Sequence, residues 1–283
     1  MMKIKRIKKP LSLKNDGNLE LVFLGAGSSF ANTLYNTNFL LIKGDTHILV
    51  DFGVTGPIAL PKVAGLQATD IEAFLPTHSH SDHIGGLEYL ALANRYIGVM
   101  GMKKPKLKMI IVKQYERVLW DMSLRGGMRW NEINEEGKYL TLKNYFDIVT
   151  PKKIKNPGRD LWRLDYNGIK LEIFRTIHIP EQALAAGDAF LSYGLFVDDR
   201  LFISGDTKFD KPLIDFYKDR SEIMFHDGAI TPNPVHACID ELRTLPKDVK
   251  KKMYLMDYSD SFKEVDISEF GGYAIQGNRY IFD

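Results

Sequence analysis

The sequence predicts an α/β protein in which two β layers pack face to face and helices cover the outside. Short apolar runs of strand length alternate with segments whose apolar residues recur at helical spacing. This order of sheet followed by helix occurs twice, once in each half of the 283-residue chain. No low-complexity linker separates the halves, so we expect residues 1–283 to form one domain.

The first half contains strand-like runs followed by a helix. The runs have turn-like ends, short connections join the first three, and they span 19–25, 38–43, 47–53 and 71–77. Apolar residues then recur at helical spacing in 83–98, among them Leu87, Leu90, Leu92 and Tyr96. The segment 76–86 therefore lies where a strand gives way to a helix, at an edge of the sheet where α/β proteins place functional residues.

The second half repeats this order without repeating the sequence. Strand-like runs span 161–166, 169–177, 190–198 and 200–206, and a helical stretch spans 211–219. A strand, a helix and two further strand-like runs follow at 222–228, 236–245, 252–259 and 273–283. The least regular part of the chain is 98–160, where we expect an insertion that covers or gates the site.

Composition bounds the functions that this chain can have. With 45% hydrophobic and 26% charged residues it falls in the globular range, and a net charge of +2 is by itself no argument for nucleic-acid binding. No run approaches the roughly 18 to 20 apolar residues that span a bilayer, and the N-terminus lacks the apolar core of a signal peptide. The single cysteine, Cys238, fits a reducing compartment. We therefore expect a cytoplasmic protein with no membrane partner.

The stretch PTHSHSDHIGG, residues 76–86, concentrates metal-binding side chains. His78 and His80 are two residues apart, so in an extended segment they point the same way and grip one ion. Asp82 and His83 follow a bend and can face a second ion. Imidazole with carboxylate suits zinc, manganese and iron. The sequence therefore predicts a centre for two divalent metal ions.

HSHSDH matches the H-x-H-x-D-H signature of the metallo-β-lactamase superfamily, whose members share an αββα sandwich. The resemblance extends along most of the chain and implies further ligands. RTIHIP supplies His178 as a third ligand of the first metal, and LFISGDT supplies Asp206 as the bridging carboxylate. In the family the last ligand is a histidine, whereas YLMDYSD carries Asp257 at the matching place.

Asp257 in place of a histidine changes the expected chemistry of the second metal. If Asp257 coordinates, two ions of total charge +4 face three carboxylates, and bound water is acidified less. An oxygen-rich site also favours manganese or iron over zinc. The alternatives are an empty or weak second site, or replacement of the missing ligand by His226 or His236.

Other stretches resemble the phosphodiesterase branch of this superfamily. VFLGAGSSF resembles the opening of ribonuclease Z, and EIMFHDGAITPNPVHACIDEL resembles its block in which an acidic residue pairs with a histidine, here Asp227 and His236. LYNTNFLL, LRGGM and GGYAIQGNRYIF resemble a bacterial and phage subgroup that includes anti-Pycsar enzymes, which hydrolyse cyclic nucleotides. Ser28 and Ser29 are candidate hydrogen-bond donors to a phosphate.

The resemblance implies that a metal-bound hydroxide attacks phosphorus while His236, oriented by Asp227, protonates the leaving alkoxide. The substrate is then a nucleotide, a cyclic nucleotide or an RNA end, and relatives of this kind are often homodimers. In the alternative interpretation of that pair, His236 only caps its helix beside a structural Asp227. For the whole chain, the alternatives are a di-iron or mononuclear protein with redox or other hydrolytic chemistry, and a relative that binds a ligand without turnover.

Overall fold

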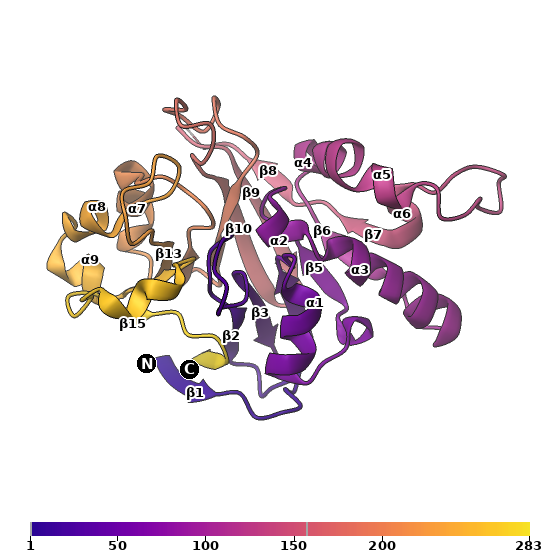
Figure 1. The fold of residues 1–283 in the computed structure, drawn as a ribbon, viewed down its shortest axis with the longest axis horizontal. Coiled ribbons are helices and arrows are strands. Elements are labelled where there is room, and N and C mark those ends of the chain that lie inside the picture. The colour runs from indigo at the N-terminus through magenta and orange to yellow at the C-terminus, as the bar shows by residue number, and fades with distance from the viewer. Residues whose placement is uncertain (1, 157) are drawn as a thin grey trace.

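Two stacked β-sheets form the centre of the fold, and helices cover both outer faces (Figure 1). The computed structural model describes residues 2–156 and 158–283. In that part of the chain the first sheet has eight strands, in the spatial order β1, β16, β2, β3, β4, β5, β6 and β7. Their bounds are β1 (Met2–Arg6), β16 (Asn278–Phe282), β2 (Leu19–Gly25), β3 (Asn38–Lys43), β4 (Thr46–Val50), β5 (Ala73–Leu75), β6 (Leu107–Ile110) and β7 (Phe146–Val149).

The second sheet also has eight strands among the described residues, in the order β15, β14, β13, β12, β11, β10, β9 and β8. Their bounds are β15 (Gly272–Tyr273), β14 (Met253–Met256), β13 (Ile223–Asp227), β12 (Leu201–Ile203), β11 (Tyr193–Val197), β10 (Ile169–Arg175), β9 (Leu161–Tyr166) and β8 (Lys152–Ile154). The strands from β8 to β12 pair antiparallel, and those from β12 to β15 pair parallel.

Helices form the two outer layers (Figure 1). On the side of the first sheet lie α1 (Gly56–Ala59), η1 (Leu60–Ala64), η2 (Ala68–Asp70), α2 (Ser81–Ile84), α3 (Leu87–Leu92), η3 (Ala93–Gly101), α4 (Lys113–Val118), η4 (Leu119–Leu124), α5 (Arg125–Met128) and α6 (Leu142–Tyr145). On the side of the second sheet lie α7 (Lys211–Lys218), α8 (Ile239–Arg243) and α9 (Lys247–Lys251), and the short η5 (Asp260–Glu264) follows β14. The four layers confirm the predicted αββα sandwich.

The second sheet is apolar on both faces, which explains why its strands are nearly continuous apolar runs. In β11, Leu195 and Val197 belong to the core shared with the first sheet, whereas Phe196 between them packs in the core that contains α7. Successive side chains of a strand point to opposite faces, so one strand supplies two cores. Tyr217 of α7 closes the outer core against three phenylalanines of the sheet, Phe174, Phe196 and Phe202.

Residues 98–160 contribute to both sheets, so the expected insertion does not span that whole range. β6 and β7 extend the first sheet, and β8 is the outer strand of the second. The longest part outside the sheets is 111–145 between β6 and β7, which contains α4, η4, α5, a loop at 129–141 and α6. The four-residue strands β6 and β7 are too short to show a period in the sequence, which is why the range looked irregular.

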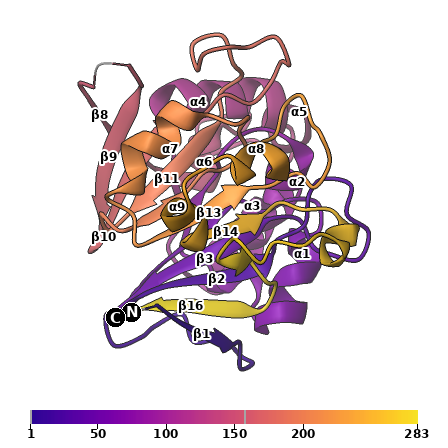
Figure 2. The same ribbon diagram turned by 90° about the vertical axis from the view of Figure 1, so that its left-hand side faces the viewer.

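The chain ends also cross the boundary between the two halves. β16 comes last in the sequence, yet it pairs with β1 and β2 in the first sheet, with Tyr280 opposite Ile4 and Leu21. Figure 2 shows β1 and β16 side by side with both termini at one end. The division of the sequence into two halves therefore corresponds only in part to the two sheets.

No helix within residues 2–156 and 158–283 has the length and apolar character needed to cross a membrane.

Candidate metal centre

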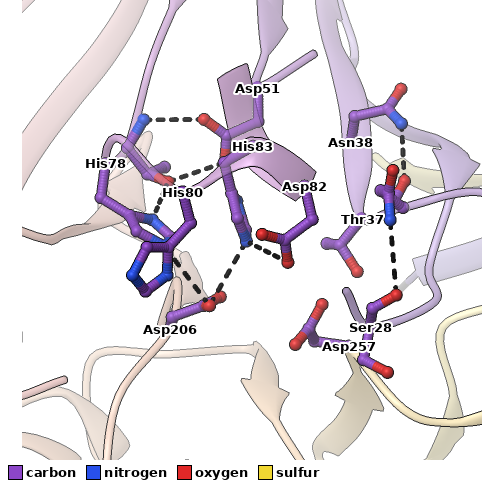
Figure 3. A network of polar contacts seen from close by, with 12 residues as sticks. Ser28, Thr37, Asn38, Asp51, His78, His80, Asp82, His83, Asp206 and Asp257 are labelled. Carbon is purple, nitrogen blue, oxygen red and sulfur yellow. Dashed lines mark hydrogen bonds and ion pairs between the residues drawn. The ribbon is translucent and has the colours of Figure 1, made fainter. Parts of the chain in front are cut away.

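The predicted ligands follow the carboxyl ends of strands from both sheets. β5 precedes His78, and β10, β12 and β14 precede the other predicted ligands His178, Asp206 and Asp257. The tight α2 turn carries Asp82 and His83. Because parallel strands end at the same edge of a sheet, four segments remote in sequence (78–83, His178, Asp206 and Asp257) meet at one place. Figure 3 shows six of these side chains close together, those of His78, His80, Asp82, His83, Asp206 and Asp257.

Three histidines and one aspartate form the first group. The Nε2 atoms of His78 and His178 each lie 3.1 Å from Nδ1 of His80. The Oδ2 atom of Asp206 lies 3.6 Å from Nε2 of His78 and 3.7 Å from Nε2 of His178. One ligand atom from each residue lies within 4.8 Å of all the others, as a single ion requires.

Asp82, His83 and Asp257 form the second group, whose ligand atoms also lie within 4.8 Å of one another. Nε2 of His83 is 3.4 Å from Oδ2 of Asp82 and 3.3 Å from Oδ2 of Asp206. Asp206 therefore touches both groups, as a bridging carboxylate would. Figure 3 shows Asp82 and Asp257 facing the same space.

Hydrogen bonds on the far side of two imidazole rings, those of His178 and His78, set which nitrogen carries the proton. Nδ1 of His178 donates to the carbonyl of Val235 at 2.9 Å, which leaves Nε2 with its lone pair. Nδ1 of His78 lies 3.1 Å from Oγ1 of Thr77, and that hydroxyl already donates to Asp51, so it accepts from His78. Such contacts orient metal-binding imidazoles and raise their basicity.

Asp51 is a functional residue that the sequence reasoning missed. Its carboxylate accepts from the Thr77 amide at 2.7 Å, from the Thr77 hydroxyl at 2.7 Å and from Nδ1 of His83 at 2.8 Å. Asp51 is buried, and it fixes His83 so that Nε2 faces the centre. The available signal was an acidic residue ending the strand-like run HILVDFG, at the edge where the histidines were expected.

The electrostatics of the first group suit neutral imidazole ligands. Burial lowers the pKa of His78 well below its ordinary value, and burial lowers that of His178 to about 4. Burial likewise lowers the pKa of His80. All three rings are therefore neutral near pH 7, as metal coordination requires.

The carboxylates of the second group favour positive charge between them. Burial lowers the pKa of His83, but the carboxylates of Asp206, Asp51 and Asp82 outweigh it and raise that pKa well above the ordinary value. Burial, together with Asp206 and Asp227, raises the pKa of Asp257 well above its usual range. The carboxylates around His83 thus stabilise positive charge at its Nε2 atom.

Some buried polar atoms in and beside the two groups have no hydrogen-bond partner among the described residues. They include Nε2 of His83, Oδ1 of Asp257 and Oδ1 of Asp227. Leaving such atoms unsatisfied costs about 1–3 kcal/mol each. Two of the three belong to the second group, so the donor set fits a second ion as well as the first.

Asp227 and His236 lie beside this centre. Nδ1 of His236 lies 2.7 Å from Oδ2 of Asp227 and 3.9 Å from Oδ2 of Asp257. Burial opposes protonation of His236, but Asp227 outweighs it and raises the pKa to about 10. His226 points elsewhere, because its Nδ1 donates to the Asp227 carbonyl within the sheet. His226 joins none of the candidate ligand groups among the described residues, whereas His236 forms a third group with Asp206 and Asp227, whose ligand atoms lie within 4.8 Å of one another.

A cavity of about 530 Å³ opens beside the second group. Asp257 and His236 line it together with Ser28 and Ser29, the two predicted phosphate-binding residues, and with Phe30. The Ser28 amide donates to the carbonyl of Tyr258 at 3.1 Å, which fastens this loop to the end of β14. The lining includes no residue of 98–160, so the part of that segment that the structure describes is not a wall of this cavity.

A family model described as "Anti-Pycsar protein Apyc1" matches residues 19–280. The chain belongs to this family. The anti-Pycsar protein Apyc1 of Paenibacillus sp. (strain J14) is 33% identical over 248 residues, which are 87% of this chain and 91% of that protein. The anti-Pycsar protein Apyc1 of Bacillus phage BSP38 is 31% identical over 270 residues, 93% of this chain and 98% of that protein. The chain is therefore a hydrolytic enzyme of the Apyc1 family, as the resemblance implied.

Solved structures confirm the metallo-β-lactamase fold. YhfI from Bacillus subtilis, a metallo-β-lactamase fold protein, has a TM-score of 0.65 at 16% identity and covers 93% of this chain and 99% of its own. The short form of human tRNase Z has a TM-score of 0.55 at 18% identity and covers 86% of this chain and 94% of its own. At these identities the likeness concerns the fold alone.

Proposed function

We propose that this Apyc1-family enzyme hydrolyses the phosphodiester bond of a cyclic nucleotide at a centre for two divalent metal ions. The observation that carries the proposal is the position of the His236–Asp227 pair, which lies against the second ligand group and lines the same cavity as Ser28 and Ser29. A proton donor, a metal centre and hydroxyl groups thus face one small-molecule cavity. Anti-Pycsar enzymes of the kind that the sequence resembles hydrolyse cyclic nucleotides.

His78, His80, His178 and Asp206 would hold the first ion, and Asp82, His83, Asp206 and Asp257 the second. Three carboxylates in the set favour manganese or iron alongside zinc. When bound, such ions acidify water and stabilise negative charge on phosphate oxygens.

His236 supplies the proton in this proposal. Its Nδ1 atom is occupied by Asp227, so Nε2 is the atom that can serve the substrate. Cleavage adds hydroxide to phosphorus and breaks the bond to one ester oxygen, which leaves as an alkoxide unless a proton reaches it. With a pKa of about 10, His236 is protonated near neutral pH and donates that proton from Nε2.

Asp227 orients His236 and keeps it charged. It is held in turn by the Thr207 amide at 3.1 Å, on the loop that also carries Asp206. Ser28 and Ser29 offer hydroxyl groups to the phosphate from the opposite loop. These residues bind and orient the substrate and deliver a proton, which is the part of the reaction that the chain itself performs.

The test is hydrolysis of cyclic mononucleotides, followed by ³¹P NMR, with metal content measured on the same preparation. Conversion of a cyclic to a linear monophosphate, lost with chelator and restored by manganese or zinc, supports the proposal. Two irons with a visible charge-transfer band and no hydrolysis would instead favour the di-iron alternative that the extra carboxylate Asp257 suggests. Absence of both metal and turnover would favour a non-catalytic relative.

The same assay distinguishes between substrate classes, and two other measurements test the assembly and the location of the enzyme. Cyclic dinucleotides and precursor tRNA serve as competing substrates, and faster cleavage of the tRNA would move the proposal to RNA ends. We further propose that the enzyme is a cytoplasmic homodimer, as implied by the resemblance and the sequence. Sedimentation equilibrium tests the dimer, and fractionation of cells tests the location.

A further inference from the structure

Phe30 is an unusual surface residue. Among the described residues it has the most exposed large apolar side chain, with 91% of its surface open to solvent. Single exposed apolar residues are common on proteins and need no explanation by themselves. Phe30 differs from the others because its ring lines the cavity that also contains His236 and Asp257.

The loop that carries Phe30 is fastened at its far side. The Asp260 carboxylate accepts from the Asn32 amide at 2.7 Å, and from the amide and hydroxyl of Thr33 at 3.0 and 2.6 Å. On the near side, the Ala31 amide donates to the Ser28 carbonyl at 3.2 Å and closes a backbone turn that includes Phe30. The loop backbone is therefore fastened on both sides of Phe30, and the exposed ring lies beside the cavity.

We propose that Phe30 stacks on the nucleobase of the substrate, so that the cavity has a base-binding side as well as a phosphate-binding side. This inference rests on the proposed function. Every nucleobase has a π-face, and stacking on an aromatic side chain is a common way for proteins to bind one. A cavity of about 530 Å³ lies within the roughly 300–1,000 Å³ typical of small-molecule sites.

The neighbouring contacts explain how the two sides are connected. Ser28 and Ser29 immediately precede Phe30, so one loop presents two hydroxyl groups and then an aromatic ring. The Ser28 amide is bonded to Tyr258, the residue after Asp257, and the Asn36 amide donates to Oγ1 of Thr55 at 2.8 Å. The backbone that carries Phe30 is thereby tied to the ligand end of β14.

The test compares two cyclic phosphates that differ only in the base. One is a 3′,5′-cyclic mononucleotide, and the other is a methyl riboside 3′,5′-cyclic phosphate, which has no base. Phe30→Ala should lower kcat/KM for the nucleotide by about 5- to 150-fold, the range that loss of one stacked base gives. It should leave hydrolysis of the base-free phosphate unchanged, and Phe30→Trp should restore activity on the nucleotide.

Met122→Ala is the matched control, because Met122 is 82% exposed and lies on η4, outside the lining of this cavity. It should change neither rate. Equal losses on both substrates in Phe30→Ala, or no loss on either, would overturn the inference. If Phe30→Ala has a lower oligomeric state in sedimentation and hydrolyses both phosphates more slowly to the same extent, the ring belongs to a contact between copies of the chain. That result would also overturn the stacking inference.

A binding measurement separates this inference from the proposed function. In Phe30→Trp, fluorescence above the wild-type background should be quenched by the cyclic nucleotide and not by the base-free phosphate. Quenching without any hydrolysis would support the stacking role while sinking the proposed reaction. If wild type and Phe30→Ala hydrolyse both phosphates at equal efficiency and no quenching occurs, the proposed reaction is supported and the stacking role of Phe30 is overturned.

Discussion

Replacing Asp51 by asparagine should weaken metal binding at the second position while leaving the fold intact. Asp51 touches no predicted ion, yet its Oδ2 atom lies 2.8 Å from Nδ1 of His83 and accepts that proton. An asparagine of the same shape can still accept from the Thr77 amide through its oxygen. The amide nitrogen of this asparagine then faces the protonated Nδ1 of His83, so two hydrogen-bond donors oppose each other.

The imidazole can relieve this conflict by moving its proton to Nε2, the atom that Asp206 and Asp82 face at 3.3 and 3.4 Å. A protonated Nε2 cannot bind a metal. Changes in residues that orient a metal-binding histidine weaken affinity by about 10- to 100-fold, and we expect this range for Asp51→Asn. Asp51→Ala removes the acceptor of three buried donors. Each unsatisfied donor costs at least about 1 kcal/mol, so this variant should lose about 3 kcal/mol of stability.

The assay is metal content by mass spectrometry after dialysis against buffered manganese or zinc, with thermal unfolding of the same samples. Asp45→Asn is the control, because it makes the same change of charge on an exposed turn beside β4, where the Asp45 side chain is 84% exposed. Asp51→Asn that folds and keeps both ions at wild-type affinity would refute the reasoning.

Three further predictions concern the centre itself. His236→Ala should lower kcat by about 10²- to 10⁴-fold with metal content intact, because it removes a proton donor and no ligand; loss of metal in that variant would make His236 a ligand. Asp257→His should keep both ions, shift preference toward zinc and retain or raise phosphodiesterase rates, whereas loss of metal and fold would contradict its assignment. Chelation should lower the unfolding temperature by roughly 10–20 °C in calorimetry, since two ions, each at 100 times its Kd, add about 2.7 kcal/mol apiece; an unchanged temperature would show that the carboxylates tolerate one another without a cation.

The predicted ligands illustrate where sequence reasoning works. His78, His80, Asp82 and His83 lie within six residues, so local geometry alone brings them near the same two predicted metal ions. His178, Asp206 and Asp257 were placed by resemblance, and the structure brings them to the same point because each follows a strand that ends at one edge. Whether these residues bind metal stays a prediction that metal analysis must test.

The segment 98–160 illustrates where prediction from the sequence fails. Its strands β6 and β7 owe their existence to pairing with β5 and with each other, across separations that no local pattern records. β16 joins the first sheet for the same reason, through pairing with β1 at the opposite end of the chain. Sheet membership is a property of partners, and partners remote in sequence leave no periodic signal in a single strand.

By itself the sequence determined the layered fold and the kind of centre, because strand length, helical spacing and the HSHSDH spacing are local properties of the chain. Only the tertiary structure decided which carboxylate orients His83 and that Phe30 lines one cavity with His236 and Asp257. Asp51 and Phe30 carry no motif, and their roles arise from contacts to His83 and from a shared cavity. Those contacts exist only once two sheets bring the ends of distant strands together.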